Sequence, residues 1–425
     1  MRQRSTYPLP DPNFWQQALR WAATQPGPVL YLAPSAMEYP HGTFLRGLAC
    51  GAIEQVQAGA GQAFSQWRKA LDASPPDWWF GHLSYDLKNE LEALQSENPN
   101  HQGFPDLAFF RPQHWLYEQE NQLVVETTWE AEGLLEAIRS TQTEEAPTAF
   151  PPLQPAMPKE QYIDTVERLR QHIEEGDVYE INFCQAFASI APGTNPVALF
   201  ERLQASSPTP FAAYYRWDQQ HLCCASPERF LKRKGRTLIS QPIKGTAPRG
   251  HDATEDAARR QGLLASEKER AENLMIVDLV RNDLARSAVP GTVTVPELFG
   301  LYTFPQVHQM ISTVTAELRP GVSGLEALAR AFPMGSMTGA PKVKVMELIE
   351  RYETTRRGLF SGAVGYLDPQ GNFDFNVVIR SLFYNGETEQ LSYQVGGAIT
   401  YDSDPEQEYA ECLVKAEAMQ QALRG

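Results

Sequence analysis

Apolar residues recur at helical spacing just beyond residue 158. Over residues 159–175 they return every three or four positions, which places them on one face of an α-helix. Gly176 follows at once, and glycine commonly ends a helix because it tolerates the left-handed conformation. The pattern therefore predicts a helix that buries one stripe. The apolar positions are Tyr162, Val166, Leu169 and Ile173.

Shorter apolar segments farther along the chain pair up around turn-forming residues. Such pairs predict β-hairpins and hence antiparallel sheets. The predicted hairpins join Phe211–Trp217 to His221–Ala225, Phe230–Arg233 to Thr237–Ile243, and Gly362–Leu367 to Phe373–Arg380. A further strand over Leu391–Tyr401 is expected to be interrupted by Gly396 and Gly397. Helical patterns at about 253–286, 341–353 and 404–424 lie between these strands, so we expect an α+β fold.

This pattern divides the chain into three parts. Residues 1–140 mix short apolar runs with Pro and Gly and show few clear elements. The stretch Thr141–Pro158 is rich in Pro, Thr and Glu and lacks periodicity, which predicts a linker over residues 141–156. Residues 157–425 hold the sharp patterns and are expected to form the main domain.

Charge limits the partners that the chain can have. Its 425 residues include 52 acidic and 37 basic ones, which gives a formal net charge of −15. A field of that sign repels nucleic acid and anionic lipid, so we expect neither nucleic acid nor a membrane as a partner. An anionic small substrate would need local cations or a metal ion to hold it.

Targeting signals and cysteine usage favour a cytoplasmic protein. The N-terminal residues lack the apolar core of a signal peptide, and no run of about 18 apolar residues predicts a membrane span. The five cysteines are odd in number and lack zinc-binding spacing, which favours reduced thiols. Cys223 and Cys224 are adjacent, which suits a strand better than a disulfide.

Two predicted helices carry a Glu-x-x-Glu pair near their N-termini, with both carboxylates on one face. Acidic residues there stabilise the helix dipole or form a solvated face. Two such pairs also supply the oxygen ligands that Mg²⁺ prefers, so both interpretations stay open. The pairs are Glu269 with Glu272, after the capping residue Ser266, and Glu408 with Glu411, after Asp404 and Pro405 and one turn before Lys415.

Lys244 ends an apolar strand and is followed by Gly245. An amine in such a turn, if partly desolvated, has a lowered pKa and becomes a nucleophile. The alternative is a surface lysine that extends into solvent. Two glycine-containing stretches, 332–342 and 394–398, either let the backbone approach a ligand or serve only packing.

Five motifs in a fixed order carry a resemblance to known enzymes. They are Ser226–Phe230, Pro242–Thr246, Glu272–Leu284, Gly339–Lys342 and Asp374–Ser381. The chain resembles the chorismate-utilising enzymes, strongly over residues 157–422 and loosely over the first 140. The resemblance implies an anthranilate synthase component I-like fold, in which antiparallel sheets form a sandwich flanked by helices. It makes residues 157–425 the chorismate-binding catalytic domain.

The residue at position 244 separates subgroups of that family. Anthranilate synthases resemble the chain closely but carry alanine in this motif, whereas lysine resembles aminodeoxychorismate synthase component I, as does the segment Gly176–Phe183. The implied reaction converts chorismate and ammonia to 4-amino-4-deoxychorismate, on the route to p-aminobenzoate and folate. Anthranilate synthase component I and isochorismate or salicylate synthase are the alternatives. A non-catalytic relative is disfavoured because the motif residues are all present.

The resemblance also implies roles for single residues. Lys244 would attack C2 of chorismate as the C4 hydroxyl leaves, with Glu228 as general acid and base for that hydroxyl. Ammonia would then add at C4 and expel the lysine. Glu269, Glu272, Glu408 and Glu411 would hold Mg²⁺ beside the ring carboxylate. The other implied substrate-binding residues are Tyr366, Arg380, Gly396, Gly397, Ala398, Lys415, Thr246 and Ser336, with His308 as a catalytic residue near the ring.

The implied reaction requires other proteins. The chain has no Gly-x-Cys-x-Gly nucleophile context, so a separate glutamine amidotransferase subunit is expected to supply ammonia. A downstream aminodeoxychorismate lyase would act on the product. The chain departs from relatives at Ala398, where glycine is common, and at Ser336, where threonine is common. It also lacks a clear Leu-Glu-Ser element in the N-terminal part, which argues against tryptophan as a ligand.

Overall fold

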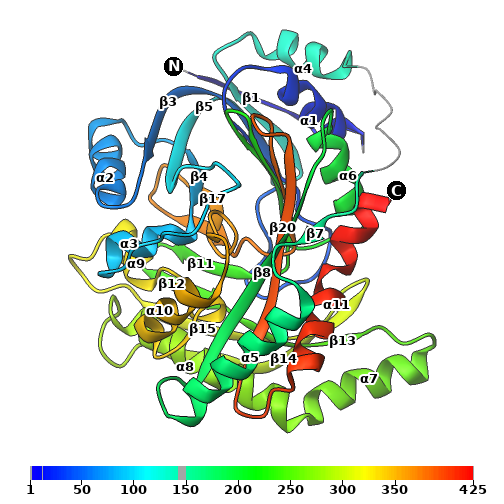
Figure 1. The fold of residues 1–425 in the computed structure, drawn as a ribbon. Coiled ribbons are helices and arrows are strands. Elements are labelled where there is room, and N and C mark those ends of the chain that lie inside the picture. Colours follow the sequence, from blue (N-terminus) through cyan, green and yellow to red (C-terminus); the bar gives the residue numbers. More distant parts are fainter. Residues whose placement is uncertain (1, 12, 142–149, 425) are drawn as a thin grey trace.

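Long antiparallel strands surrounded by helices make up the fold (Figure 1), in a computed structural model that describes residues 2–11, 13–141 and 150–424. The strands are β1 (Gln3–Pro8), β2 (Val29–Leu32), β3 (Gly47–Ala58), β4 (Trp79–Leu83), β5 (Leu107–Gln119), β6 (Gln122–Thr127), β7 (Gln154–Pro155), β8 (Glu180–Ile190), β9 (Phe211–Trp217), β10 (Gln220–Ser226), β11 (Arg229–Lys234), β12 (Thr237–Gln241), β13 (Ile243–Pro248), β14 (Thr294–Thr303), β15 (Val307–Glu317), β16 (Gly339–Ala340), β17 (Ala363–Leu367), β18 (Phe373–Asn376), β19 (Ser381–Asn385) and β20 (Gln390–Ile399). The helices are α1 (Phe14–Thr24), α2 (Ala63–Ala73), α3 (Lys88–Leu91), α4 (Ala131–Arg139), α5 (Lys159–Glu174), α6 (Pro196–Ser206), α7 (Ala253–Ala265), α8 (Glu267–Ala285), α9 (Gly324–Ala331), α10 (Lys342–Tyr352) and α11 (Pro405–Arg424), with 3₁₀ turns at Tyr85–Leu87 and Gly335–Met337. Half of the predicted linker, residues 142–149, lies outside the described residues.

The strands alternate their side chains between two cores. Along β10, Leu222 and Cys224 join one buried cluster, and Cys223 and Ala225 join the other. The first cluster lies among strands and helices α2, α8 and α9, and the second lies between strands and helices α1, α4, α6 and α11. A third cluster packs α5 and α10 against β8. This arrangement confirms the expected α+β fold, and the two adjacent cysteines are free and buried in a strand.

Several predicted elements are confirmed with small changes. Helix α5 begins at Lys159, and Gly176 takes the left-handed conformation (φ 83°) just after its end. The predicted helix over 253–286 is two helices, because the Ser266 hydroxyl accepts the Glu269 backbone N–H and starts a new one. Pro242 separates β12 from β13, because proline cannot donate to the ladder.

The expected interruption of the last strand was wrong. Strand β20 pairs with β8 without a break through Gly396 and Gly397. A Cβ at Gly396 would lie 2.0 Å from the Phe183 carbonyl oxygen, so the glycine allows close approach of the two strands rather than a bulge. The hairpin strand predicted to reach Arg380 ends at Asn376, and Arg380 itself adopts a left-handed conformation (φ 51°).

Strands from the first 140 residues pair with strands from the later part. β2 is bonded to β9, and β4 is bonded to β17, all in antiparallel register. The division at residues 140 and 157 stays a prediction, but the two ranges contribute to one sheet. The long strands β8 and β20 run through the centre of the molecule, with α11 alongside β20 (Figure 1). These elements, with α8 and β13, position the residues described next.

Candidate active site

Lys244 points into the molecule from β13. Its side chain is 13% exposed, and its Nζ donates to Glu180 Oε1 at 3.0 Å. The alternative of a solvent-directed surface lysine therefore does not hold. Burial lowers the pKa of Lys244, but the neighbouring carboxylates of Glu180, Glu272 and Glu228 outweigh it, and the net pKa is raised. The expected lowering of its pKa was wrong because acidic neighbours surround the amine.

Glu228 lies in the turn between β10 and β11 and is almost fully buried. Its backbone N–H donates to the Ser226 hydroxyl at 3.2 Å, which fixes the turn. Burial raises the pKa of the carboxyl to about 7, although the Ser336 hydroxyl, Lys244 and Arg380 each act to lower it. A carboxyl with that pKa holds a proton near neutral pH and can give it to a leaving hydroxyl.

Arg380 places a cation beside Glu228. Its left-handed backbone conformation is held by a hydrogen bond from the Ala225 N–H to the Arg380 carbonyl (3.2 Å). Burial lowers the pKa of the guanidinium, and Glu228 acts in the opposite direction. A non-glycine residue in this conformation costs free energy that the surrounding fold has to offset, which is typical of functional sites.

The two Glu-x-x-Glu pairs face each other from α8 and α11. Burial raises the pKa of Glu272 to about 7, and raises that of Glu269 and Glu408. The charge of Glu411 adds to the rise at Glu269, which shows that the helices are electrostatically close. Burial acts to raise the pKa of Glu411 as well, but Lys415, at 2.7 Å, lowers it overall.

These carboxylates are oxygen ligands of the kind that a hard divalent cation prefers, although no three of them have ligand atoms within 4.8 Å of one another. Glu408 Oε1 accepts a hydrogen bond from the Ser403 hydroxyl at 2.7 Å, whereas its Oε2 is buried without a partner. A buried carboxylate oxygen without a donor is costly, and a metal ion satisfies it. A Cβ at Gly397 would lie 2.9 Å from that oxygen, so the glycine leaves room beside it.

The β20 backbone borders the same place. Lys415 Nζ donates to the Gly396 carbonyl at 3.1 Å, and a Cβ at Gly397 would lie 3.7 Å from that ammonium. Ala398 follows on the strand, opposite Asn182 of β8. The segment therefore brings peptide groups, a lysine and the α11 carboxylates together.

Three of the predicted residues lie among other partners. Tyr366 packs its ring against Trp78 and Phe80, with ring centroids 5.7 and 6.2 Å away, inside an aromatic cluster. Thr246 is exposed on β13. His308 is buried, and its ring nitrogens are engaged by Asp256 at 3.0 Å and the Thr303 hydroxyl at 2.9 Å. None of the three contacts Lys244 or Glu228 among the interactions of the described side chains.

Glu180 is a site residue to which the sequence assigned no role. It begins β8, is fully buried, and pairs with Lys244. The available signal was a charged residue inside the otherwise apolar start of a strand, which requires a partner when buried. Its Oε2, like that of Glu408, has no hydrogen-bond partner.

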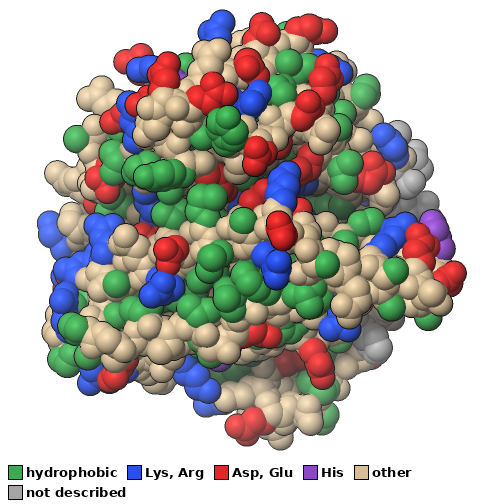
Figure 2. All heavy atoms as spheres, turned by 90° about the horizontal axis from the view of Figure 1, so that it is seen from below, with side chains coloured by type: hydrophobic (Ala, Val, Ile, Leu, Met, Phe, Trp, Pro, Cys, Tyr) green, Lys and Arg blue, Asp and Glu red, His purple; other side chains and the backbone are tan. Residues whose placement is uncertain are grey.

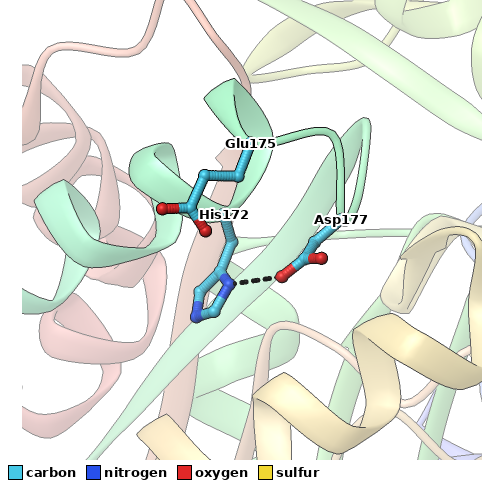
Figure 3. A group of neighbouring side chains, drawn as sticks. All are labelled: His172, Glu175 and Asp177. Atoms are coloured by element: carbon cyan, nitrogen blue, oxygen red, sulfur yellow. Dashed lines mark hydrogen bonds and ion pairs between the residues drawn. The ribbon is translucent and has the colours of Figure 1, made fainter.

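A second acidic group lies on the surface at the end of α5 (Figure 3). His172, Glu175 and Asp177 form the one described group whose potential ligand atoms lie within 4.8 Å of one another. His172 Nδ1 contacts Asp177 at 2.7 Å, and its Nε2 contacts the Tyr352 hydroxyl at 3.2 Å. Both ring nitrogens are thus used in joining the helix end to its neighbours, and we assign no metal to the group.

Charged side chains of both signs occupy the face shown in Figure 2. Acidic and basic side chains are interspersed over most of it, and several basic ones are grouped at the left of the view. Within the described ranges, none of the helices has the length and apolar character needed to cross a membrane.

Comparisons with known proteins identify the family. The family model for chorismate binding enzymes matches residues 33–421. An anthranilate synthase component I-like protein of Synechocystis is 35% identical over 358 residues, 82% of this chain and 73% of that protein. Aminodeoxychorismate synthase component 1 of Bacillus subtilis is 34% identical over 386 residues, 85% of this chain and 82% of the relative.

A second relative is a longer protein, and a further match is a solved structure. The chain spans 49% of the aminodeoxychorismate synthase of Streptomyces griseus, with 39% identity over 359 residues that make up 80% of this chain. The crystal structure of anthranilate synthase component I from Streptococcus pneumoniae matches with a TM-score of 0.76 and 25% identity, over 90% of this chain and 95% of the other. The chain belongs to the family of chorismate binding enzymes.

Proposed function

We propose that this chain is the synthase component that aminates chorismate at C4 to give 4-amino-4-deoxychorismate. The observation that carries the proposal is the buried amine of Lys244, which hydrogen-bonds to Glu180 and interacts electrostatically with Glu228, a carboxyl whose pKa burial raises to about 7. A nucleophile and an acid so placed can attack one side of a ring system while a hydroxyl leaves. Relatives named aminodeoxychorismate synthase support the choice of product.

The reaction divides between two residues. Lys244 forms a bond to C2, the two conjugated ring double bonds shift toward C4, and the C4 hydroxyl leaves as water with the proton of Glu228. Ammonia then bonds to C4, both double bonds shift back, and the C2–N bond to Lys244 breaks. Glu228 takes up the proton that the added ammonia loses. Arg380 and Lys415 provide the positive charge that a dicarboxylate substrate needs inside an acidic protein.

We assign Glu269, Glu272, Glu408 and Glu411 as the residues that would hold Mg²⁺. The buried, unpartnered Glu408 Oε2 and the approach of carboxyl groups from α8 and α11 support a cation among them. Bound there, Mg²⁺ supplies Lewis-acid stabilisation of the substrate carboxylate and of the leaving hydroxyl.

Ammonia is scarce in its neutral form at physiological pH, so we propose a glutamine amidotransferase partner as its source. The Bacillus subtilis relative is named component 1, and this name supports a partner protein that acts as the second component. The product keeps its enolpyruvyl group, so a lyase that removes pyruvate has to follow. We place the reaction in the cytoplasm, where reduced thiols suit the five free cysteines.

Product identification tests this function. Purified protein is incubated with chorismate, Mg²⁺ and an ammonium salt, and the product is identified by mass and by NMR. We expect 4-amino-4-deoxychorismate, with its enolpyruvyl group retained and the new nitrogen at C4. Anthranilate, isochorismate or salicylate as the product would contradict the proposal. The Lys244→Ala variant serves as the matched control and is expected to lose C4 amination.

A further inference from the structure

Glu180 is placed to exchange a proton with Lys244. The carboxylate comes from the first residue of β8 and the amine from β13, and their atoms lie 3.0 Å apart in the interior. Glu180 is fully buried, whereas its neighbour Tyr179 is 71% exposed. The Tyr179 N–H donates to the Ala340 carbonyl at 2.7 Å, which fixes where the strand begins and turns the Glu180 side chain inward.

The resting amine needs such a partner. Lys244 faces the carboxyl groups of Glu180 from β8, Glu272 from α8 and Glu228 from the β10–β11 turn. A lysine amine is ordinarily protonated at neutral pH. An ammonium has no lone pair, so it cannot attack carbon until it gives up a proton. Glu228 has to keep its own proton for the leaving hydroxyl, and Glu272 belongs to the proposed metal site. Glu180 is the one of the three that hydrogen-bonds to the amine.

The second oxygen of Glu180 is an unsatisfied acceptor inside the protein. Glu180 Oε2 is buried and has no hydrogen-bond partner among the described residues. Buried ion pairs stabilise a fold poorly unless the remaining lone pairs are satisfied, because desolvation is costly. A carboxylate with one oxygen on the amine and one unpaired has an acceptor oxygen that can take up a proton.

We propose that Glu180 is the base that takes a proton from the Lys244 ammonium before its attack on chorismate, and returns it when the amine is released. The step moves one proton from Nζ to the Glu180 carboxylate and leaves a neutral amine and a neutral acid. The amine lone pair then forms the bond to C2. After ammonia expels the amine, the proton goes back from Glu180 to Nζ, so both groups end as they began. This role rests on the proposed C4 amination.

The Glu180→Gln variant tests the proposal, because the amide keeps the shape and accepts the same hydrogen bond but is not basic. In the variant the amine has to lose its proton to water, so turnover depends on the fraction of neutral amine. We expect kcat at pH 7 to fall about 100-fold or more, with the optimum of kcat moved to higher pH and KM for chorismate nearly unchanged. Glu180→Asp keeps a carboxylate and is expected to retain the wild-type optimum at lower kcat.

Two results would overturn the role of Glu180. One is a Glu180→Gln variant with wild-type kcat, and the other is a drop in kcat that is equal at every pH with an unmoved optimum. If Glu180→Gln does not fold, Glu180→Asp decides alone: an unmoved optimum supports the role, and a shifted one contradicts it. Wild-type protein that makes no 4-amino-4-deoxychorismate would instead refute the proposed function, so the two failures are separable.

Discussion

At the residue scale, the site depends on carboxyl groups that the fold buries at a cost. Glu228 is the clearest case, because its folded pKa of about 7 lies above the ordinary value of 4.5. Ionisation is therefore harder in the folded state than in the unfolded chain. The cost is absent below pH 4.5, where both states are protonated. It grows as the pH rises to about 7 and stays constant above that.

Glu228→Gln should consequently lose activity and gain stability. Loss of the general acid and base is expected to lower kcat by about 100-fold or more. Removal of the buried ionisation should stabilise the fold at pH 8 by on the order of 3 kcal/mol, and little at pH 4. Thermal unfolding of both proteins at the two pH values measures the difference. An equal change in stability at pH 4 and pH 8 would show that Glu228 is not the titrating group.

At the element scale, helices α8 and α11 and strand β20 together form the proposed cation site. We expect Mg²⁺ to raise the unfolding temperature, because a ligand that binds only the folded state stabilises it, by about 2.7 kcal/mol at 100 times its dissociation constant. Glu408→Gln should abolish most of this stabilisation. Glu406→Gln is the matched control, because Glu406 lies on the same helix but is exposed and paired with Lys159. Equal stabilisation of all three proteins would remove Glu408 from the site.

The two neighbouring glycines of β20 give a second prediction at this scale. In Gly397→Ala the new methyl group meets the Glu408 carboxylate at 2.9 Å, a side-chain end that can move. We expect the variant to fold, with an apparent KM for Mg²⁺ or chorismate that is at least about tenfold higher than that of the wild type. In Gly396→Ala the methyl group meets the Phe183 carbonyl oxygen at 2.0 Å, so we expect loss of folding. Circular dichroism and KM measurements distinguish the two, and unchanged KM values for Gly397→Ala would contradict the prediction.

The sequence predicted the local elements well because hairpins and helix caps depend on neighbouring residues. The helix start at Ser266 and the hairpin of β9 and β10 are examples. Pairings over long separations leave no such signal. Glu180 and Lys244 are 64 positions apart, so only the folded chain shows that they meet. Tyr366 was expected near the substrate, but its ring packs against Trp78, in a part of the chain whose pattern predicted few elements.

At the scale of the whole molecule, the first 140 residues are joined to the rest by more than strand pairing. The buried guanidinium of Arg229 makes a salt bridge to Asp374 and also donates to the carbonyls of Pro40 and Gly42. We therefore expect a fragment of residues 157–425 to be insoluble or unfolded, because β9 and β17 would lose partners. Calorimetry of the full chain should show one transition. Two well-separated transitions, or a stable fragment, would contradict this expectation.

The site itself draws on elements from distant parts of the chain. Carboxylates from β8, α8 and α11 lie around an amine from β13. Arg380 follows β18, which pairs with β17, and β17 in turn pairs with the N-terminal strand β4. The positions of the site residues therefore depend on the folding of the whole chain. Loss of the N-terminal strands is expected to abolish activity even though they contribute no residue that contacts Lys244 in the described structure.

The most direct measurement of the central claim is the mass of the protein after exposure to chorismate and Mg²⁺ without ammonia, followed by acid quenching and peptide mapping. We expect an added mass equal to chorismate less one water, located on the peptide that contains Lys244 and absent from the Lys244→Ala variant. An unmodified Lys244 peptide in protein that aminates chorismate once ammonia is added, or the same adduct on Lys244→Ala, would contradict the account.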